Sequence, residues 1–323
     1  MLNQIEDFVR PTQKELFSTL CKIFGERAIS KKNGYILVPG DAPIMLVAHL
    51  DTVHKEKVKH ICKSPDGNIL MSPQGIGGDD RCGVYALMTI HKICHQKPWL
   101  LFTCDEEIGC LGAGIFCEQY HKGKLPKELD ALKCLVEIDR RGEKDAVYYD
   151  CANIEFEDYI TSKGFVTDFG SCSDISEIAP ALGLAAVNLS SGYYNAHTQH
   201  EYINLKQLKT TIKKVVEIVN ESVEETFPKY EFIEEVWEPR GYFGRGYYGS
   251  SSWSAPEFDE KILQQVPAFI RDEYEELLDY YTPEELNEYI ESYGPEIIKT
   301  LYDSEIGYFY NGLSTEEKED GEK

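Results

Sequence analysis

Ile44-Met45-Leu46-Val47-Ala48-His49-Leu50-Asp51 joins a short apolar run to a histidine and an aspartate. An apolar run of this length suits a strand that is buried on both faces of a parallel sheet. Three further runs of the same kind occur at Trp99 to Thr103, Cys134 to Ile138 and Leu184 to Leu189. The sequence therefore predicts four buried strands.

Helices are predicted in the segments between these strands. The clearest pattern is an apolar stripe at steps of three and four residues from Leu205 to Val223. Alternation of strands and helices is typical of an α/β fold. We expect a mostly parallel (mixed) sheet with helices on both faces.

Polar side chains follow each of the four apolar runs. In order along the chain they are His49 and Asp51, Glu106 and Glu107, Asp139 and, after a longer gap, His197. In open α/β sheets, ligands bind at the carboxyl ends of the strands. These acids and imidazoles are therefore expected to meet at one edge of the sheet.

Each of these features also has an interpretation without chemistry. A histidine at a strand end is commonly just hydrogen-bonded, and adjacent glutamates such as Glu106-Glu107 are commonly solvated. Asp79 and Asp80, after Gly75 to Gly78, could cap a helix because an acid there satisfies free backbone amides. The glycines lack the Gly-x-Gly-x-x-Gly spacing of a dinucleotide site. The conjunction of all these residues at expected strand ends favours a metal site.

Five ordered motifs resemble the signatures of the co-catalytic zinc exopeptidases, a superfamily that includes bacterial leucyl aminopeptidases, peptidase T and glutamyl aminopeptidases. The motifs are Val47 to Val53, Gly78 to Val84, Asp105 to Gly109, Glu137 to Asp139, and Tyr194 to His197 with Glu201. The resemblance covers residues 1–226 and implies a phosphorylase/hydrolase-like zinc exopeptidase fold. Many relatives insert a lid domain between the last two ligands, but only 57 residues separate Asp139 from His197 here. No lid is expected.

The resemblance implies two Zn²⁺ ions, for which Co²⁺ or Mn²⁺ could substitute. The implied ligands are His49, Asp79 and Asp139 for one ion, and Asp79, Glu107 and His197 for the other. Asp79 would then bridge the two ions. His200 competes with His197 for the last position, and the spacing to Glu201 favours His197.

Two further carboxylates are expected to serve the reaction. Glu106, next to a ligand but not itself one, would act as general base towards water. Asp51 can accept from the second ring nitrogen of His49 and so fix its tautomer. The resemblance also implies a cis peptide bond between Asp79 and Asp80.

The expected function is a zinc-dependent metallopeptidase, most simply an aminopeptidase that releases N-terminal residues from peptides. An aspartate at position 139 is similar to the aminopeptidase branch of the superfamily. The alternative within enzymes is a deacylase of N-acyl amino acids or another small-amide hydrolase. The alternative outside enzymes is an interaction protein with an acidic tail and reduced catalysis.

Charge divides the chain into two parts. Residues 1–227 hold 25 basic and 32 acidic side chains, whereas residues 228–323 hold 8 basic and 24 acidic ones. We expect a catalytic domain over residues 1–226, a Gly/Tyr/Ser-rich linker over 227–255, an acidic helical module over 256–312 and a disordered tail over 313–323. The acidic module is a candidate site for a protein partner.

Composition excludes several classes of protein. A net charge of −23 offers no basic surface for nucleic acid. No stretch approaches the length of about 18 apolar residues that a membrane span needs. The ten cysteines include no Cys-x-x-Cys pair and are too few for a disulfide scaffold. Together with the absence of a secretion signal, they favour the cytoplasm.

Overall fold

The computed structural model divides the chain into two compact units, Met1–Trp237 and Glu238–Lys323. It describes residue 2, residues 4–170 and 172–234, and, in the second unit, residues 266, 267, 270, 271, 274, 277, 286, 287, 289, 290, 295 and 297–305.

An eight-stranded sheet forms the centre of the first unit, in the order β1-β2-β6-β3-β7-β10-β8-β9. Its strands are β1 (Ile29–Lys31), β2 (Tyr35–Val38), β3 (Ile44–His49), β6 (Trp99–Thr103), β7 (Cys134–Arg140), β8 (Asp145–Val147), β9 (Val166–Thr167) and β10 (Ala186–Ser190). The four middle strands, β6, β3, β7 and β10, are parallel. β1, β2 and β8 pair antiparallel with their inner neighbours, so the sheet is mixed, as expected.

The four middle strands lie at the four apolar runs of the sequence. Their residues are apolar because these strands are buried on both faces. Their side chains alternate between two hydrophobic cores. In β3, Ile44, Leu46 and Ala48 enter the first core, whereas Met45 and Val47 enter the second. The period of two is the geometry of a strand with apolar layers on both sides.

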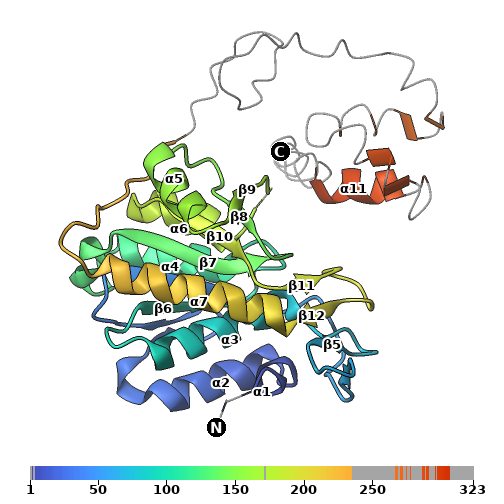
Figure 1. Ribbon diagram of the computed structural model, residues 1–323, viewed down its shortest axis with the longest axis horizontal. Helices are drawn as coiled ribbons and strands as arrows, with labels where there is room; N and C mark the ends of the chain where they lie inside the picture. The colour runs from blue at the N-terminus through green and yellow to red at the C-terminus, as the bar shows by residue number, and fades with distance from the viewer. Residues whose placement is uncertain are drawn as a thin grey trace, which may run out of the picture. The chain divides into compact units, whose positions relative to one another are not determined.

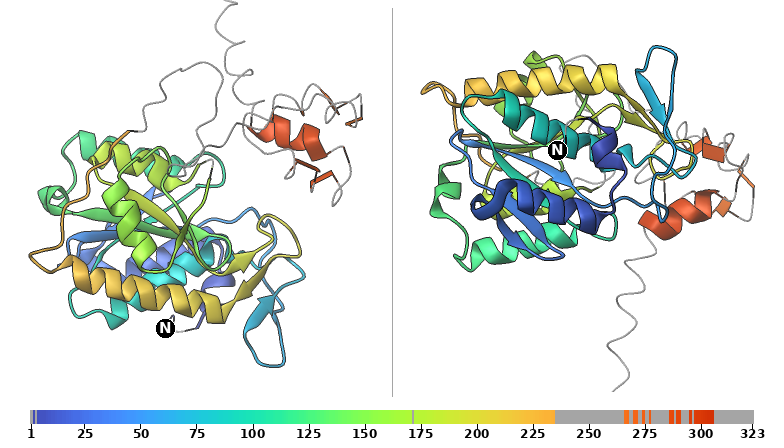
Figure 2. Two further views of the ribbon diagram at one scale, coloured as in Figure 1. Left: turned by 45° about the horizontal axis from the view of Figure 1, so that its top comes forward. Right: turned by 90° about the horizontal axis from the view of Figure 1, so that it is seen from below.

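Helices cover both faces of this sheet (Figure 1 and Figure 2). The helices of the first unit are α1 (Glu6–Val9), α2 (Gln13–Phe24), α3 (Gly78–Ile93), α4 (Leu111–His121), α5 (Ile154–Ser162), α6 (Asp174–Leu182) and α7 (Leu205–Ser222), with 3-10 turns η1 (Gly25–Arg27) and η2 (Lys127–Ala131). Buried residues of α2, α3, α5 and α7 belong to the first core, and those of α4 and α6 to the second.

Local sequence explains where two of these helices begin. Thr12 caps α2, and its side chain and that of Glu15 form a reciprocal capping box. Asn204 caps α7 by accepting from the Lys206 and Gln207 amides. The stripe predicted along α7 is the face that it buries, including Leu208, Ile212, Val215 and Val219.

A second, four-stranded antiparallel sheet follows the order β11-β12-β5-β4. Its strands are β4 (Cys62–Lys63), β5 (Ile69–Met71), β11 (Tyr193–Tyr194) and β12 (Tyr202–Asn204). The loop between β11 and β12 contains His197 and Glu201. This small sheet therefore carries part of the candidate site.

The sequence places the end of the catalytic domain at residue 226. In the structure, the first unit continues past this residue. Phe227 and Tyr230 are buried in the first core. Glu231 and Glu234 form isolated bridges with Leu184 and Cys151. These contacts place residues 227–234 on the first unit.

The described part of the second unit contains helix α11 (Ile297–Glu305), inside the expected acidic helical module. A small apolar cluster contains Val266, Ile270, Tyr274, Leu277, Leu286 and Ile298. The expected tail, and the larger part of the expected linker, lie outside the described residues.

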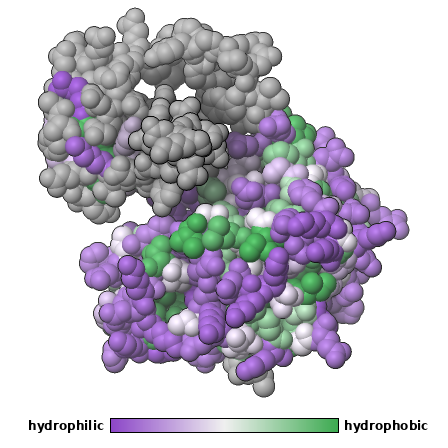
Figure 3. Space-filling model, turned by 180° about the vertical axis from the view of Figure 1, so that it is seen from behind, coloured by the Kyte–Doolittle hydropathy of each residue, from purple (hydrophilic) through white to green (hydrophobic). Residues whose placement is uncertain are grey.

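Among the described residues, no helix combines the length and apolar character needed to cross a membrane. Seen from behind, the coloured surface is largely hydrophilic and is crossed by a band of apolar residues (Figure 3).

Candidate metal centre

Five separate segments deliver the expected metal ligands to one end of the sheet. His49 is the last residue of β3, and Asp139 lies near the end of β7. Glu107 follows β6, Asp79 lies at the start of α3, and His197 lies between β11 and β12. The site therefore sits where the parallel strands end, the position at which open α/β sheets bind ligands.

The five side chains form two groups that share Asp79. The inner ligand group is His49, Asp79 and Asp139, and the outer ligand group is Asp79, Glu107 and His197. Within each group, the candidate ligand atoms all lie within 4.8 Å of one another.

Asp79 has the position of a bridge between the two groups. Its Oδ1 lies 3.1 Å from His49 Nε2, whereas its Oδ2 lies 3.3 Å from His197 Nε2. Asp139 Oδ2 lies 3.6 Å from His49 Nε2, and Glu107 Oε2 lies 2.9 Å from His197 Nε2. Each oxygen of the Asp79 carboxylate thus lies close to a different imidazole.

This donor set fits a pair of divalent ions. Imidazole nitrogen and carboxylate oxygen are ligands that zinc takes in proteins. Glu107 Oε1 is buried and has no hydrogen-bond partner among the described residues. A buried, unpartnered carboxylate oxygen is costly, and a cation at this position would satisfy it.

Electrostatics point the same way. The Asp79 and Glu107 carboxylates raise the pKa of His197 to about 10. Burial lowers the pKa of His49, but Asp139, Asp51 and Asp79 outweigh burial and raise it well above its ordinary value. Both imidazoles therefore sit where positive charge is stabilised, and a metal ion would replace their protons with a larger positive charge.

Asp51 links β3 to the segment that contains the paired glutamates. Its two oxygens accept from the backbone amides of Glu106 and Glu107, both at 3.1 Å. Its Oδ1 also lies 3.3 Å from His49 Nδ1, a close contact without good hydrogen-bond alignment. Asp51 is therefore placed to orient both a ligand histidine and the Glu106-Glu107 backbone.

Glu106 lies beside the inner ligand group without belonging to it. Its Oε2 is 3.9 Å from His49 Nε2. Burial raises the pKa of Glu106 to about 7. A carboxylate with a raised pKa next to a metal site is suited to proton transfer near neutral pH.

The segment before Asp79 is held by a buried glutamate. Glu201 is fully buried and accepts from the Gly77 amide at 2.8 Å and the Asp79 amide at 2.9 Å. It also contacts His54 Nε2 at 2.7 Å. In the sequence, Glu201 is only part of a motif, because spacing alone does not reveal which amides a carboxylate will accept from.

Two backbone features shape the same segment. The Asp79–Asp80 peptide bond is cis, which confirms the expectation from the family resemblance. At Gly78, a Cβ atom would lie 2.8 Å from the Tyr193 Cβ and 2.9 Å from the Ile203 side chain. Glycine is therefore needed where α3 approaches the small sheet.

His200 is not part of either ligand group. Its backbone amide donates to Thr198 Oγ1, and its carbonyl accepts from Asn195 Nδ2. His197, not His200, is the histidine that the structure brings to Asp79 and Glu107.

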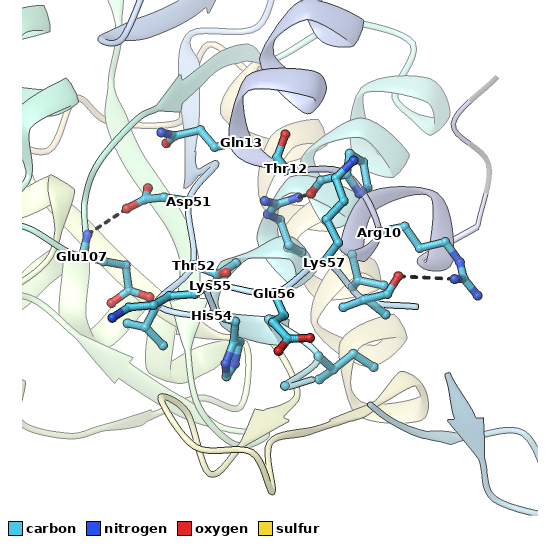
Figure 4. Close-up of a pocket in the computed structure, with 18 of the residues that line it drawn as sticks. Arg10, Thr12, Gln13, Asp51, Thr52, His54, Lys55, Glu56, Lys57 and Glu107 are labelled. Atoms are coloured by element: carbon cyan, nitrogen blue, oxygen red, sulfur yellow. Dashed lines mark hydrogen bonds between the residues drawn. The ribbon is translucent and has the colours of Figure 1, made fainter. Parts of the chain in front are cut away.

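Two cavities adjoin the centre, and Glu107 lines both of them. The large cavity has a volume of about 500 Å³ and lies between the start of α2, the segment Asp51–Val58 and the segment Gly75–Gly77. Lys55 and Glu107 both line this cavity (Figure 4). The small cavity has a volume of about 220 Å³ and contains ligands of both groups.

Residues 31–219 match the model of peptidase family M28. No curated protein matches the chain.

Similar solved structures include the aminopeptidase PepT from Bacillus cereus, with 15% identity, a TM-score of 0.50, and coverage of 68% of this chain and 97% of that one. A tripeptidase from Staphylococcus aureus matches with 14% identity, a TM-score of 0.50 and the same coverage. An aminopeptidase from the archaeon Desulfurococcus kamchatkensis matches with 13% identity, a TM-score of 0.50, and coverage of 67% and 93%. At these identities the likeness concerns the fold.

Proposed function

This chain belongs to peptidase family M28, and on that premise we propose that it is a di-zinc aminopeptidase. The proposed zinc ligands are His49, Asp79, Asp139, Glu107 and His197. The observation that carries the proposal is the pair of ligand groups that share Asp79. The names of similar structures, two aminopeptidases and a tripeptidase, support a peptide substrate with a free amino terminus.

Zinc at these ligands would supply Lewis acidity, which polarises the scissile carbonyl and lowers the pKa of water. Glu106 is the proposed general base. It would take a proton from the attacking water and return the proton to the leaving amine. Asp51 holds the Glu106 backbone amide and contacts the His49 ring, so it acts as a positioning residue.

We also propose that the protein works in a reducing compartment, the cytoplasm. All ten cysteines are free thiols in the structure, and six of them are buried. Burial raises the pKa of several, including Cys104, Cys117 and Cys134, each to about 12. Buried protonated thiols are structural and gain nothing from an oxidising environment.

The test offers two classes of substrate, aminoacyl p-nitroanilides and N-acetyl amino acids, to the purified, zinc-loaded full chain and measures the hydrolysis of each. Turnover of the first class, reduced by roughly 10²- to 10⁴-fold in a Glu106→Gln control prepared in parallel, is the expected result. Preference for the N-acetyl compounds would make the protein a deacylase instead. Absence of zinc and of all turnover would favour an interaction protein.

A further inference from the structure

We propose that Arg141 makes the small cavity a recognition site for a substrate carboxylate next to the scissile bond. The inference rests on the proposed function, because it assigns a substrate class to the same site. It concerns two consecutive arginines, Arg140 and Arg141, that directly follow the ligand Asp139.

Both arginines line the small cavity together with the metal centre. Glu106, Glu107 and His197 are part of the same lining. Any substrate whose scissile bond lies at the centre therefore brings its neighbouring groups close to the two guanidinium-bearing side chains.

The guanidinium group of Arg140 already donates hydrogen bonds to other residues of the protein. Its Nη2 donates to Asp168 Oδ2 at 3.1 Å and to the Phe169 carbonyl oxygen at 2.7 Å. Only 20% of its side chain is exposed. These bonds tie the end of β7 to the segment before α6, so Arg140 shapes the cavity wall.

Arg141 differs from its neighbour in this respect. It is exposed, and within the described residues its side chain has no hydrogen bond or ion pair, although its charge acts through space on Asp145 and Asp168. Its backbone is fixed, because its carbonyl accepts from Ser190 Oγ at 2.7 Å. A cation on an anchored backbone is thus available to a ligand.

The charge balance of the cavity favours an anion. Two divalent ions, the three carboxylate ligands and an ionised Glu106 would together be neutral. Arg140 is balanced by Asp168. Arg141 is then the one charge in the described lining that no group in contact balances, so an anionic substrate group would complete the balance.

Guanidinium groups bind carboxylates through paired, charge-assisted hydrogen bonds. A volume of about 220 Å³ is below the range of about 300–1,000 Å³ typical of drug-sized ligand sites, so it suits a single residue. The carboxylate has two sources: an acidic side chain on the N-terminal residue, or the carboxyl terminus of a dipeptide.

Two matched substrate pairs separate these sources. Glu-Ala-Ala-amide against Gln-Ala-Ala-amide tests the side chain, and Ala-Ala against Ala-Ala-amide tests the carboxyl terminus. The zinc-loaded full chain is compared with Arg141→Gln. Lys144→Gln is the control, because it removes an exposed positive charge three positions away that does not line the cavity.

We expect kcat/KM to favour the anionic member of one pair by about 10- to 100-fold, the usual range for a hydrogen-bonded charged group. Arg141→Gln should abolish this preference, and Lys144→Gln should keep it. Equal rates within both pairs, or a preference that survives in Arg141→Gln, would overturn the proposal and leave the peptidase assignment intact.

Calorimetric binding of L-glutamate and L-glutamine gives a readout that does not need turnover. If no peptide is cleaved but glutamate binds more tightly than glutamine, and only with Arg141 present, the carboxylate site stands and the proposed function fails. If neither cleavage nor Arg141-dependent binding of either amino acid is seen, both fail.

Discussion

The inner and outer ligand groups use the same kinds of donor but are built differently. His49 of the inner group is fully buried on a central strand, whereas 56% of the His197 side chain in the outer group is exposed on a loop. Burial by the sheet fixes the inner group before any ion binds. We infer that the inner ion is held tightly and that the outer ion exchanges.

The surroundings of each group agree with this difference. In the inner group, the Asp139 amide donates to Asn188 Oδ1 at 2.8 Å, and the Tyr193 hydroxyl donates to Asp139 Oδ1 at 3.4 Å. In the outer group, His197 has a left-handed φ of 63° in a turn in which Thr198 Oγ1 donates to the Asn195 carbonyl. The inner ligands are thus supported by strands, and the outer histidine by one turn.

Removal of the shared ligand should have the largest effect. Asp79→Asn keeps the side-chain volume but removes the charge that both groups use. We expect metal content to fall well below two ions per chain and turnover to fall by more than the roughly 10²- to 10⁴-fold typical of a lost general base. Elemental analysis and kinetics check this. Retention of two ions would show that Asp79 does not bridge them.

Removal of one histidine from each group should separate the two sites. After dialysis against a chelator, His197→Ala should retain about one ion and regain part of its activity in excess zinc, because binding follows mass action. His49→Ala removes a ligand itself. Its affinity for zinc should therefore fall by more than the roughly 10- to 100-fold that is lost when a residue hydrogen-bonded to a ligand is removed. Equal metal loss in both variants would remove the distinction between the groups.

Glu201 should contribute to stability through the segment that carries Asp79. Glu201→Gln replaces one acceptor with a donor that faces backbone amides, and loss of a charged, buried hydrogen bond costs about 1.5–3 kcal/mol. For a domain of this size, Tm should fall by roughly 3–12 °C. The matched control is Glu217→Gln on the exposed face of α7. A Tm equal to that of the control would contradict the role assigned to Glu201.

The smallest effect is expected from removal of the second unit. The chain divides into two compact units, and among the described residues no candidate metal ligand lies beyond His197. We propose that residues 1–237 fold alone, keep both ions and turn over substrate as the full chain does. Circular dichroism and metal analysis check this. An insoluble or unfolded fragment would show that the catalytic unit depends on the rest of the chain.

The sequence predicts the middle of the sheet better than its margins. β3, β6, β7 and β10 are largely apolar runs, and burial on both faces leaves a signal that composition reveals. Short strands such as β4 and β9 are exposed and have no such signal. Their pairing depends on contacts with neighbours distant in sequence.

The same limit applies to the candidate site. His49 and Asp139 follow from their position at the ends of apolar runs, whereas His197 required family resemblance to be preferred over His200. Arg141 reads as an ordinary turn residue next to a glycine. Its proposed role follows from the cavity that it lines. A cavity is formed by segments that are distant from one another in the sequence.

The most direct test of the central claim, two ions served by Glu106 as base, is metal content and turnover measured on Glu106→Gln and Glu107→Gln side by side. Glu106→Gln should keep two ions and lose roughly 10²- to 10⁴-fold in kcat, because the amide cannot accept a proton. Glu107→Gln should lose the outer ion and regain activity in excess zinc. Loss of zinc from the Glu106 variant with both ions kept in the Glu107 variant would reverse the roles, and full activity with full zinc in both would contradict the proposed centre.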